Sequence, residues 1–149
     1  MIIPEARFTD RVIFYEMGRP DYPRTVLDLL KKKAGLKKDH VVADIGCGTG
    51  ISSQLFLENG NQVFGVDPNN AMLRACESLR PRYKSFRSVI GKSDATNLPD
   101  ESIDFVVAAQ AFHWFDPEST KPEFDRILKP GGHISLIWNE RKTEGTEFL

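Results

Sequence analysis

Three glycines and an acid form the part of the sequence best suited to binding a ligand. In "VVADIGCGTG", Asp44 is followed by Gly46, Gly48 and Gly50, directly after a short apolar run. Each glycine raises the entropy cost of folding, so three within five positions indicate that the backbone approaches a ligand closely. A simple tight turn is the alternative, although a turn requires only one or two glycines.

The loop differs from two common phosphate-binding loops. No "GK[ST]" follows the glycines, which argues against hydrolysis of a nucleoside triphosphate. A dinucleotide loop of the form G-x-G-x-x-G would need glycine where this chain has Ile51. The carboxylate of Asp44 would repel a pyrophosphate, but it suits a ligand that carries an ammonium group. The pattern therefore favours a ligand with a positive group at this end.

Asp67 ends the next apolar run. It lies about 20 residues beyond the glycine loop, where an acid accepts hydrogen bonds from both hydroxyls of a ribose. A 2′-phosphate there would face a like charge, at a cost of about 4 kcal/mol for a separation of about 4 Å and an effective dielectric constant of about 20. The sequence therefore favours an unphosphorylated adenosine. Asp67 could also cap the helix beyond Pro68, and the two roles are compatible.

Two further side chains fit an adenine base. Met72 follows Asp67 in a helical pattern and offers a polarisable side chain to the face of a purine. Asp94, in "GKSDA", could accept a hydrogen bond from the exocyclic amine. Taken singly, Met72 is more typical of a core and Asp94 of a loop. The adenosine interpretation therefore rests on their combination with Asp67.

Alternating apolar runs and amphipathic segments position these residues. We expect strands at 41–45, 62–67, 84–90, 103–110 and 133–139, and helices at 23–35, 51–60, 69–80 and 117–128, the last behind a cap at Asp116. A segment with Phe8, Val12 and Tyr15 at helical spacing is expected to form a separate leading helix.

The alternation predicts an α/β fold, a Rossmann-like doubly wound parallel sheet with helices on both faces and five strands. Ligands bind such sheets beyond the carboxyl ends of the strands, where the strand order reverses. The site is therefore expected in the loops that follow Ile45, Val66, Val89 and Ala109.

The sequence resembles a known family in four stretches, "VVADIGCGTG", "VFGVDPNNAML", "GKSDATNLPDESIDFVVAAQAFHWF" and "EFDRILKPGGHISLI". Their order and spacing are similar to those of the class I S-adenosylmethionine-dependent methyltransferases, particularly the small-molecule branch known as methyltransferase type 11. The leading "FYEMGRPDYP" resembles the N-terminal motif of relatives near trans-aconitate methyltransferase. The resemblance implies an enzyme that transfers a methyl group from S-adenosylmethionine to a small-molecule acceptor and releases S-adenosylhomocysteine.

The resemblance also implies a role for each motif residue. The acid and glycines of the first loop would hold the methionine part of the cofactor, Asp67 the ribose, and Met72 and Asp94 the adenine. Gln110 would lie near the transferable methyl group, while the N-terminal lid would supply two residues. The implied cofactor-binding set is Tyr15, Arg19, Asp44, Gly46, Gly48, Gly50, Asp67, Pro68, Met72, Asp94, Ala95 and Gln110.

His113, in "AFHWF", is the candidate catalytic base. It follows the fourth expected strand, and imidazole titrates near neutral pH, which would help if the acceptor is a hydroxyl or an acidic carbon. A histidine packed in an aromatic cluster is an equally good interpretation. The neighbouring rings of Phe112, Trp114 and Phe115 either line an acceptor pocket or stabilise a sulfonium, or they pack beneath the lid.

The family's usual sheet has seven strands, whereas this sequence predicts five. We therefore expect a single domain over residues 1–149, with a lid at 1–22 and a core at 23–149 that lacks the last two strands. The apolar run at 133–139 would then leave one edge of the sheet open to pairing.

Composition narrows the partners and the location. A formal net charge of -1 over 149 residues supplies no basic field for nucleic acid. The two cysteines, Cys47 and Cys76, lack a metal-ligand or disulfide spacing, so no metal is expected and a reducing, cytoplasmic location is favoured. No apolar run approaches the roughly 18 residues of a membrane helix. The oligomeric state has no signature in the sequence.

Two other functions stay open at this point. A nicotinamide-dependent oxidoreductase is disfavoured by Ile51 and by the lack of a substrate domain. A non-catalytic cofactor-binding or interaction module is suggested by the absence of the last two strands. The methyl acceptor and its reacting atom are not indicated by any motif.

Overall fold

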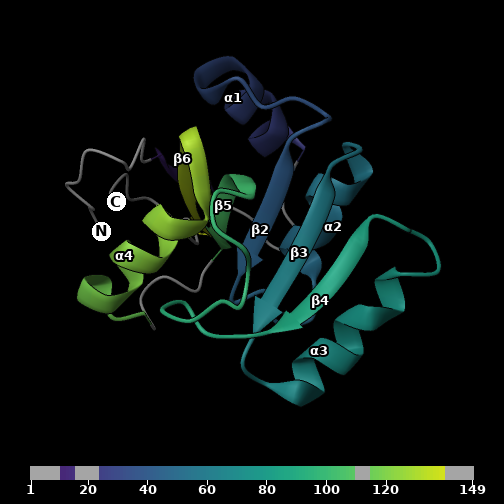
Figure 1. The fold of residues 1–149 in the computed structure, drawn as a ribbon. Helices are drawn as coiled ribbons and strands as arrows, with labels where there is room; N and C mark the ends of the chain where they lie inside the picture. The colour runs from purple at the N-terminus through teal and green to yellow at the C-terminus, as the bar shows by residue number, and fades with distance from the viewer. Residues whose placement is uncertain (1–10, 16–23, 110–114, 140–149) are drawn as a thin grey trace, which may run out of the picture.

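The computed structural model describes residues 11–15, 24–109 and 115–139, with the backbone alone for 11–15 and 138–139. This part of the chain forms one parallel sheet in the order β1-β6-β5-β2-β3-β4 (Figure 1). Its strands are β1 (Arg11–Tyr15), β2 (Val41–Ile45), β3 (Gln62–Asp67), β4 (Phe86–Ile90), β5 (Ile103–Ala109) and β6 (Leu128–Asn139). Its helices are α1 (Thr25–Ala34), α2 (Ile51–Glu58), α3 (Asn70–Cys76), the 3₁₀ turn η1 (Glu77–Leu79) and α4 (Pro117–Ile127).

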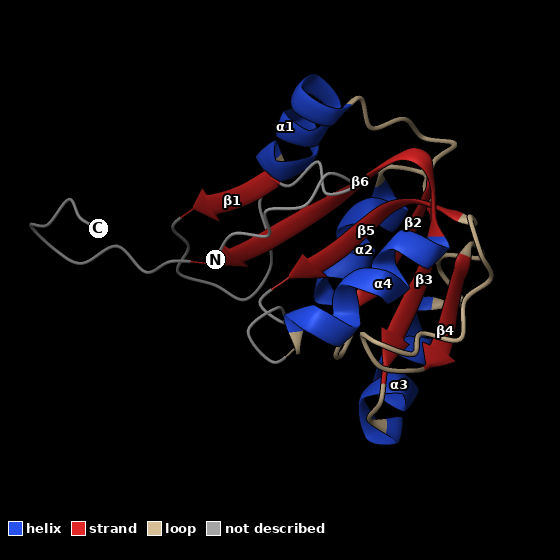
Figure 2. Ribbon diagram, turned by 60° about the vertical axis from the view of Figure 1, so that its left-hand side comes forward, coloured by secondary structure: helices blue, strands red, loops and turns tan. Residues whose placement is uncertain are grey.

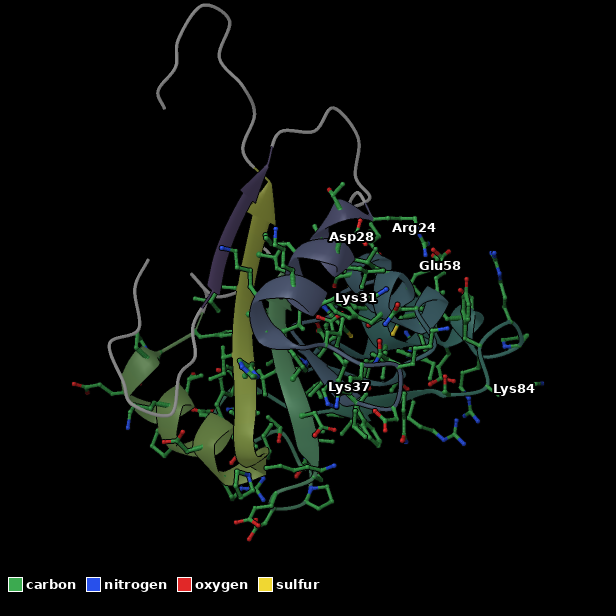
Figure 3. All side chains as sticks on the ribbon, turned by 90° about the horizontal axis from the view of Figure 1, so that it is seen from above. Arg24, Asp28, Lys31, Lys37, Glu58 and Lys84 are labelled. Carbon is green, nitrogen blue, oxygen red and sulfur yellow. The ribbon has the colours of Figure 1, made fainter. Side chains whose placement is uncertain are left out.

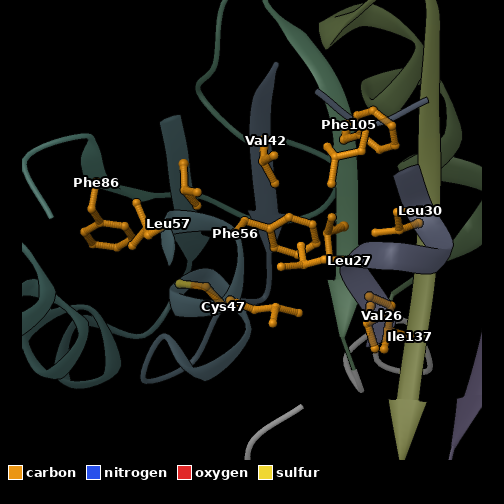
Figure 4. Close-up of a cluster of buried hydrophobic side chains, with 14 of the residues drawn as sticks. Val26, Leu27, Leu30, Val42, Cys47, Phe56, Leu57, Phe86, Phe105 and Ile137 are labelled. Carbon is orange, nitrogen blue, oxygen red and sulfur yellow. The ribbon is translucent and has the colours of Figure 1, made fainter. Parts of the chain in front are cut away.

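Helices cover both faces of the sheet, as expected. Successive residues of a strand point to opposite faces, and those of β5 from Phe105 to Ala108 divide accordingly between two hydrophobic clusters. One cluster joins the sheet to α1, α2 and α3, and Figure 4 shows its centre around Leu27, Phe56 and Phe105. The other joins the sheet to α4 through Phe124 and Ile127, both fully buried.

Helix α1 illustrates how local sequence sets an element. Val26, Leu27 and Leu30 face the core, while its charged residues are exposed, two of which, Asp28 and Lys31, are labelled in Figure 3. Gly35 ends the helix with φ +71°, and its N–H donates to the carbonyl of Lys31 at 3.2 Å. A left-handed residue after the last turn is the commonest place for glycine at a helix end. The helix expected at 23–35 is therefore confirmed within the described range.

The expected leading helix is wrong for residues 11–15, which form β1 instead. This strand pairs in parallel with β6, from Arg11 opposite Ser135 to Tyr15 opposite Asn139, and it lies along β6 in Figure 2. Spacing alone does not separate a short apolar run in a helix from one in a strand. Pairing decided the outcome, because β6 offers unpaired backbone groups along its edge. The sheet thus has a sixth strand, and the edge expected to be open is covered.

Two further elements differ clearly from the expected ones, beyond shifts of one or two residues at the ends of others. The segment at 69–80 divides into α3 and η1, since helices often tighten to 3₁₀ geometry in the last turn. The strand expected at 133–139 begins at Leu128, immediately after α4, where Leu128 lies opposite Ile103 of β5. Within the described part of the chain, none of the helices has the length and apolar character needed to cross a membrane.

Candidate functional site

A cavity of about 750 Å³ lies at the carboxyl ends of four neighbouring strands, β5, β2, β3 and β4. The strand order reverses between β2 and β5, which is where open α/β sheets bind their ligands. All four loops expected to form the site contribute to it. The lining residues are Gly46, Gly48, Asp67, Pro68, Asn69, Met72, Gly91, Lys92, Ser93, Asp94, Phe115 and Asp116.

The glycine loop after β2 turns sharply across the top of β3. The N–H groups of Gly46 and Cys47 both donate to the carbonyl of Val66, at 2.7 and 3.1 Å. Gly46 and Gly48 have φ angles of +74° and +58°, which residues with a Cβ rarely adopt. A Cβ on Gly48 would meet no atom within 4 Å, so glycine is required there by the backbone conformation and not by lack of space. The outer side of this residue is open. These two glycines bring bare backbone to the wall of the cavity.

Gly50 has a different reason to be glycine. It is buried, lies outside the cavity lining, and has φ +96°. A Cβ at this position would lie 2.8 Å from Cδ1 of Leu79 and 3.1 Å from Cβ of Cys76. The third glycine therefore allows α2 to begin in close contact with α3 and η1. Its contact with a cofactor stays a prediction.

Asp67 joins the glycine loop to the loop after β3. One carboxylate oxygen accepts from the N–H of Gly48 at 3.0 Å, and the other accepts from the N–H of Asn69 at 2.9 Å. A carboxylate has about four lone-pair sites, so two of them are left for a ligand. The helix cap is Asn69, whose side chain accepts from the N–H groups of Ala71 and Met72. Asp67 is thus held rigidly in the cavity wall.

The two residues expected to meet an adenine, Met72 and Asp94, both line the cavity. Met72 projects from the first turn of α3 and is 41% exposed, and Asp94 lines the cavity from the loop after β4. Ala95 lies outside the lining, but its backbone exchanges two hydrogen bonds of 3.0 Å with Lys92. This tight turn holds Ser93 and Asp94 at its tip.

Asp44 lies beneath the glycine loop rather than in the cavity wall, and its side chain is fully buried. Its Oδ2 accepts from the hydroxyls of Ser52 and Ser53, at 2.6 and 2.7 Å, which ties β2 to the first turn of α2. Its Oδ1 has no hydrogen-bond partner within the structure described. Burial raises the pKa of this carboxyl to about 6 against the effect of the two serines, with a smaller contribution from the charge of Asp67.

Several expected site residues fall outside the described ranges. Arg19, Gln110 and His113 are among them, and for Tyr15 the structure describes only the backbone at the end of β1. Their roles stay predictions.

Some lining residues were not expected in the site. These are Asn69, Gly91, Lys92, Ser93 and Asp116. All five lie in the loops beyond the strand ends, so their position in those loops was the available signal. Asp116 was expected as a helix cap, and its carboxylate does accept from the N–H of Ser119 at 3.2 Å.

The part of the sequence that forms the cavity matches a known protein family. A family model described as a methyltransferase domain matches residues 43–136, from within β2 through most of β6. The chain belongs to this methyltransferase family. An uncharacterized methyltransferase of Mycobacterium tuberculosis is 39% identical over 134 residues, covering 90% of this chain and 52% of that protein. A methyltransferase-like protein of Schizosaccharomyces pombe is 33% identical over 135 residues, with coverage of 90% and 52%.

Solved structures agree with the fold. The YcgJ protein of Bacillus subtilis has a TM-score of 0.63 and 28% identity, over 72% of this chain and 47% of that chain. An S-adenosylmethionine-dependent methyltransferase of Aquifex aeolicus has a TM-score of 0.67 over 85% of this chain and 78% of that chain, and at 19% identity it shows the fold alone. The expected class I methyltransferase family and α/β fold are confirmed. The chain spans about half the length of the curated relatives named above.

Proposed function

We propose that the protein uses S-adenosylmethionine to methylate a small-molecule acceptor. The observation that carries the proposal is the position of Asp67, which is 9% exposed in the cavity wall and bonded to the backbone of the glycine loop. A buried acid with spare acceptor sites beside bare backbone suits the ribose of an adenosine. Membership of the methyltransferase family supports the same ligand.

The residues present fit each part of this cofactor. Asp67 would accept from the ribose hydroxyls, Met72 would lie against the adenine, and Asp94 would accept from its amine. The buried, unpartnered Oδ1 of Asp44 fits an ammonium group at the other end of the molecule, and the charge of this carboxylate would repel a phosphate there. A buried acceptor without a partner is costly, so a donor from the cofactor would stabilise it.

The cofactor supplies an electrophilic methyl group on a sulfonium, and the protein's part is to orient the acceptor and exclude water. Positioning of this kind can contribute about 7 to 11 kcal/mol to a rate. In the sequence, Gln110 and His113 lie between the end of β5 at Ala109 and Phe115, which lines the cavity, and this supports the predicted roles of Gln110 and of His113 as a base. The N-terminal motif supports a small-molecule acceptor and a relationship to trans-aconitate methyltransferase. The two cysteines, which form no disulfide, support a cytoplasmic location.

Calorimetric titration with S-adenosylhomocysteine and with NAD tests the cofactor. We expect binding of the first and none of the second. Asp67→Ala should weaken binding by about 100-fold or more, because a hydrogen bond to a charged group contributes about 1.5 to 3 kcal/mol and two ribose bonds are lost. Asp67→Asn is the matched control, since it keeps the shape and one acceptor and should lose less.

Transfer of a labelled methyl group to candidate organic acids, alcohols and amines tests the reaction. Unchanged affinity in Asp67→Ala, or preferential binding of NAD, would contradict the cofactor assignment. Binding without transfer to any acceptor would instead favour a non-catalytic module.

A further inference from the structure

The loop between β4 and β5 carries the proposed adenine contacts, yet its shape is set from another element. Gly91 lies at its start in close packing, since a Cβ there would meet the carbonyl oxygen of Thr96 at 2.6 Å. The turn from Lys92 to Ala95 places Asp94 at the cavity. The side chains that hold this loop in place come largely from α4. This helix packs on the face of the sheet opposite to α1, α2 and α3.

Glu123 of α4 binds the centre of the loop. Its Oε2 accepts from the N–H of Thr96 at 2.8 Å and from the Thr96 hydroxyl at 2.6 Å. Thr96 is fully buried two residues after Asp94. Hydrogen bonds from Arg126 and from Thr96 hold the pKa of the Glu123 carboxyl at about 2, so it is charged at any physiological pH.

Arg126 extends the same contact to the end of the loop. Its guanidinium donates to both oxygens of Glu123, at 2.9 and 2.7 Å, which makes a bidentate pair. It also donates to the carbonyl of Leu98 at 2.7 Å and to the carboxylate of Asp100 at 2.5 Å. The planar guanidinium therefore fixes Glu123 and the outgoing loop in one geometry.

A third contact joins α4 to the tip of the loop. The hydroxyls of Ser93 and Thr120 are 2.7 Å apart, and Ser93 itself lines the cavity. Contacts from α4 thus reach the loop before and after Asp94, although neither Glu123 nor Arg126 lines the cavity.

We propose that Glu123 and Arg126 are positioning residues for adenine recognition, because they hold the loop that presents Asp94. This inference rests on the proposed function. It assigns to α4 a part in selecting the base of the cofactor without touching it. Loss of the contact should let Asp94 move away from the exocyclic amine, and selectivity for adenine should fall more than general binding does.

The test compares the affinity for S-adenosylhomocysteine with that for S-inosylhomocysteine, which has an oxygen in place of the adenine amine. The wild-type chain should prefer the adenine form about tenfold or more, as one hydrogen bond to a carboxylate predicts. Glu123→Ala should reduce that preference at least about fivefold, and Glu123→Gln, which keeps one acceptor for Thr96, should give an intermediate preference. Lys121→Gln is the matched control, because it breaks an ion pair with Asp125 on the same helix.

The pattern of losses separates positioning from simple destabilisation. The inference would be overturned if a variant that still unfolds cooperatively lost the same factor of affinity for both ligands. It would also be overturned if the preference for the adenine ligand did not change. Glu123→Gln keeps the size and shape of the side chain without its charge, so its ligand preference tests the inference if Glu123→Ala does not fold. A wild-type chain that binds neither ligand would instead contradict the proposed function, and this inference with it.

Discussion

Replacing Asp44 with asparagine tests the cost of burying a carboxylate beneath the glycine loop. The pKa of this group rises from an ordinary value of 3.8 to about 6, chiefly through burial. The difference, 6 − 3.8 = 2.2 pH units, corresponds to about 3 kcal/mol at about 1.36 kcal/mol per unit. Asparagine keeps an acceptor for the two serine hydroxyls and carries no charge.

The sign of the pH dependence follows from which protonation form of the Asp44 carboxyl the folded state prefers. A raised pKa means that the folded protein favours the protonated carboxyl, so the stabilising contribution is complete below pH 3.8 and is lost as the pH rises to about 6. The free energy of unfolding of the wild type, relative to Asp44→Asn, should therefore fall by about 2 to 3 kcal/mol between pH 4 and pH 7.5. Urea denaturation of both proteins across this range, without cofactor, measures the difference.

The two serines provide an internal control. Their hydrogen bonds lower the pKa of Asp44, so Ser52→Ala with Ser53→Ala should raise it further and extend the pH dependence to higher pH. A free-energy difference that is independent of pH would refute the reasoning, because it would mean that the carboxylate is not buried in the folded state. A difference of the opposite slope would mean that a cation pairs with it.

Two further predictions concern the glycine loop and the helix after β3. Gly50→Ala should lower the free energy of unfolding by about 2 to 3 kcal/mol, since it combines a left-handed φ of +96° with contact against Leu79; Leu79→Ala in the same chain should restore part of it, and full stability in Gly50→Ala alone would be inconsistent with this packing. Asn69→Ala should cost about 1 kcal/mol by removing the cap of α3, whereas Asn69→Asp should cost little. Chemical denaturation measures each, and equal losses in the two Asn69 variants would argue against capping.

Much of the fold follows from local sequence. The apolar runs that became β2, β3 and β5, the glycine after α1 and the asparagine cap of α3 all act within a few residues. Turn residues and hydrophobic periodicity reflect such short-range preferences. These elements and the loops around the cavity could therefore be predicted from the sequence. Asp67, Met72 and Asp94 were expected together because parallel strands bring their carboxyl ends to one edge.

Long-range contacts decided the rest. Residues 11–15 became a strand because β6, more than a hundred positions later, supplied a partner for their backbone. Gly50 is required by Leu79 and Cys76, and Glu123 reaches Thr96 from another helix. The sequence alone therefore determined which loops, with Asp67, Met72 and Asp94 in them, line the cavity. The tertiary structure decided that Asp44 would be buried with one oxygen unpaired, since only packing controls access to water.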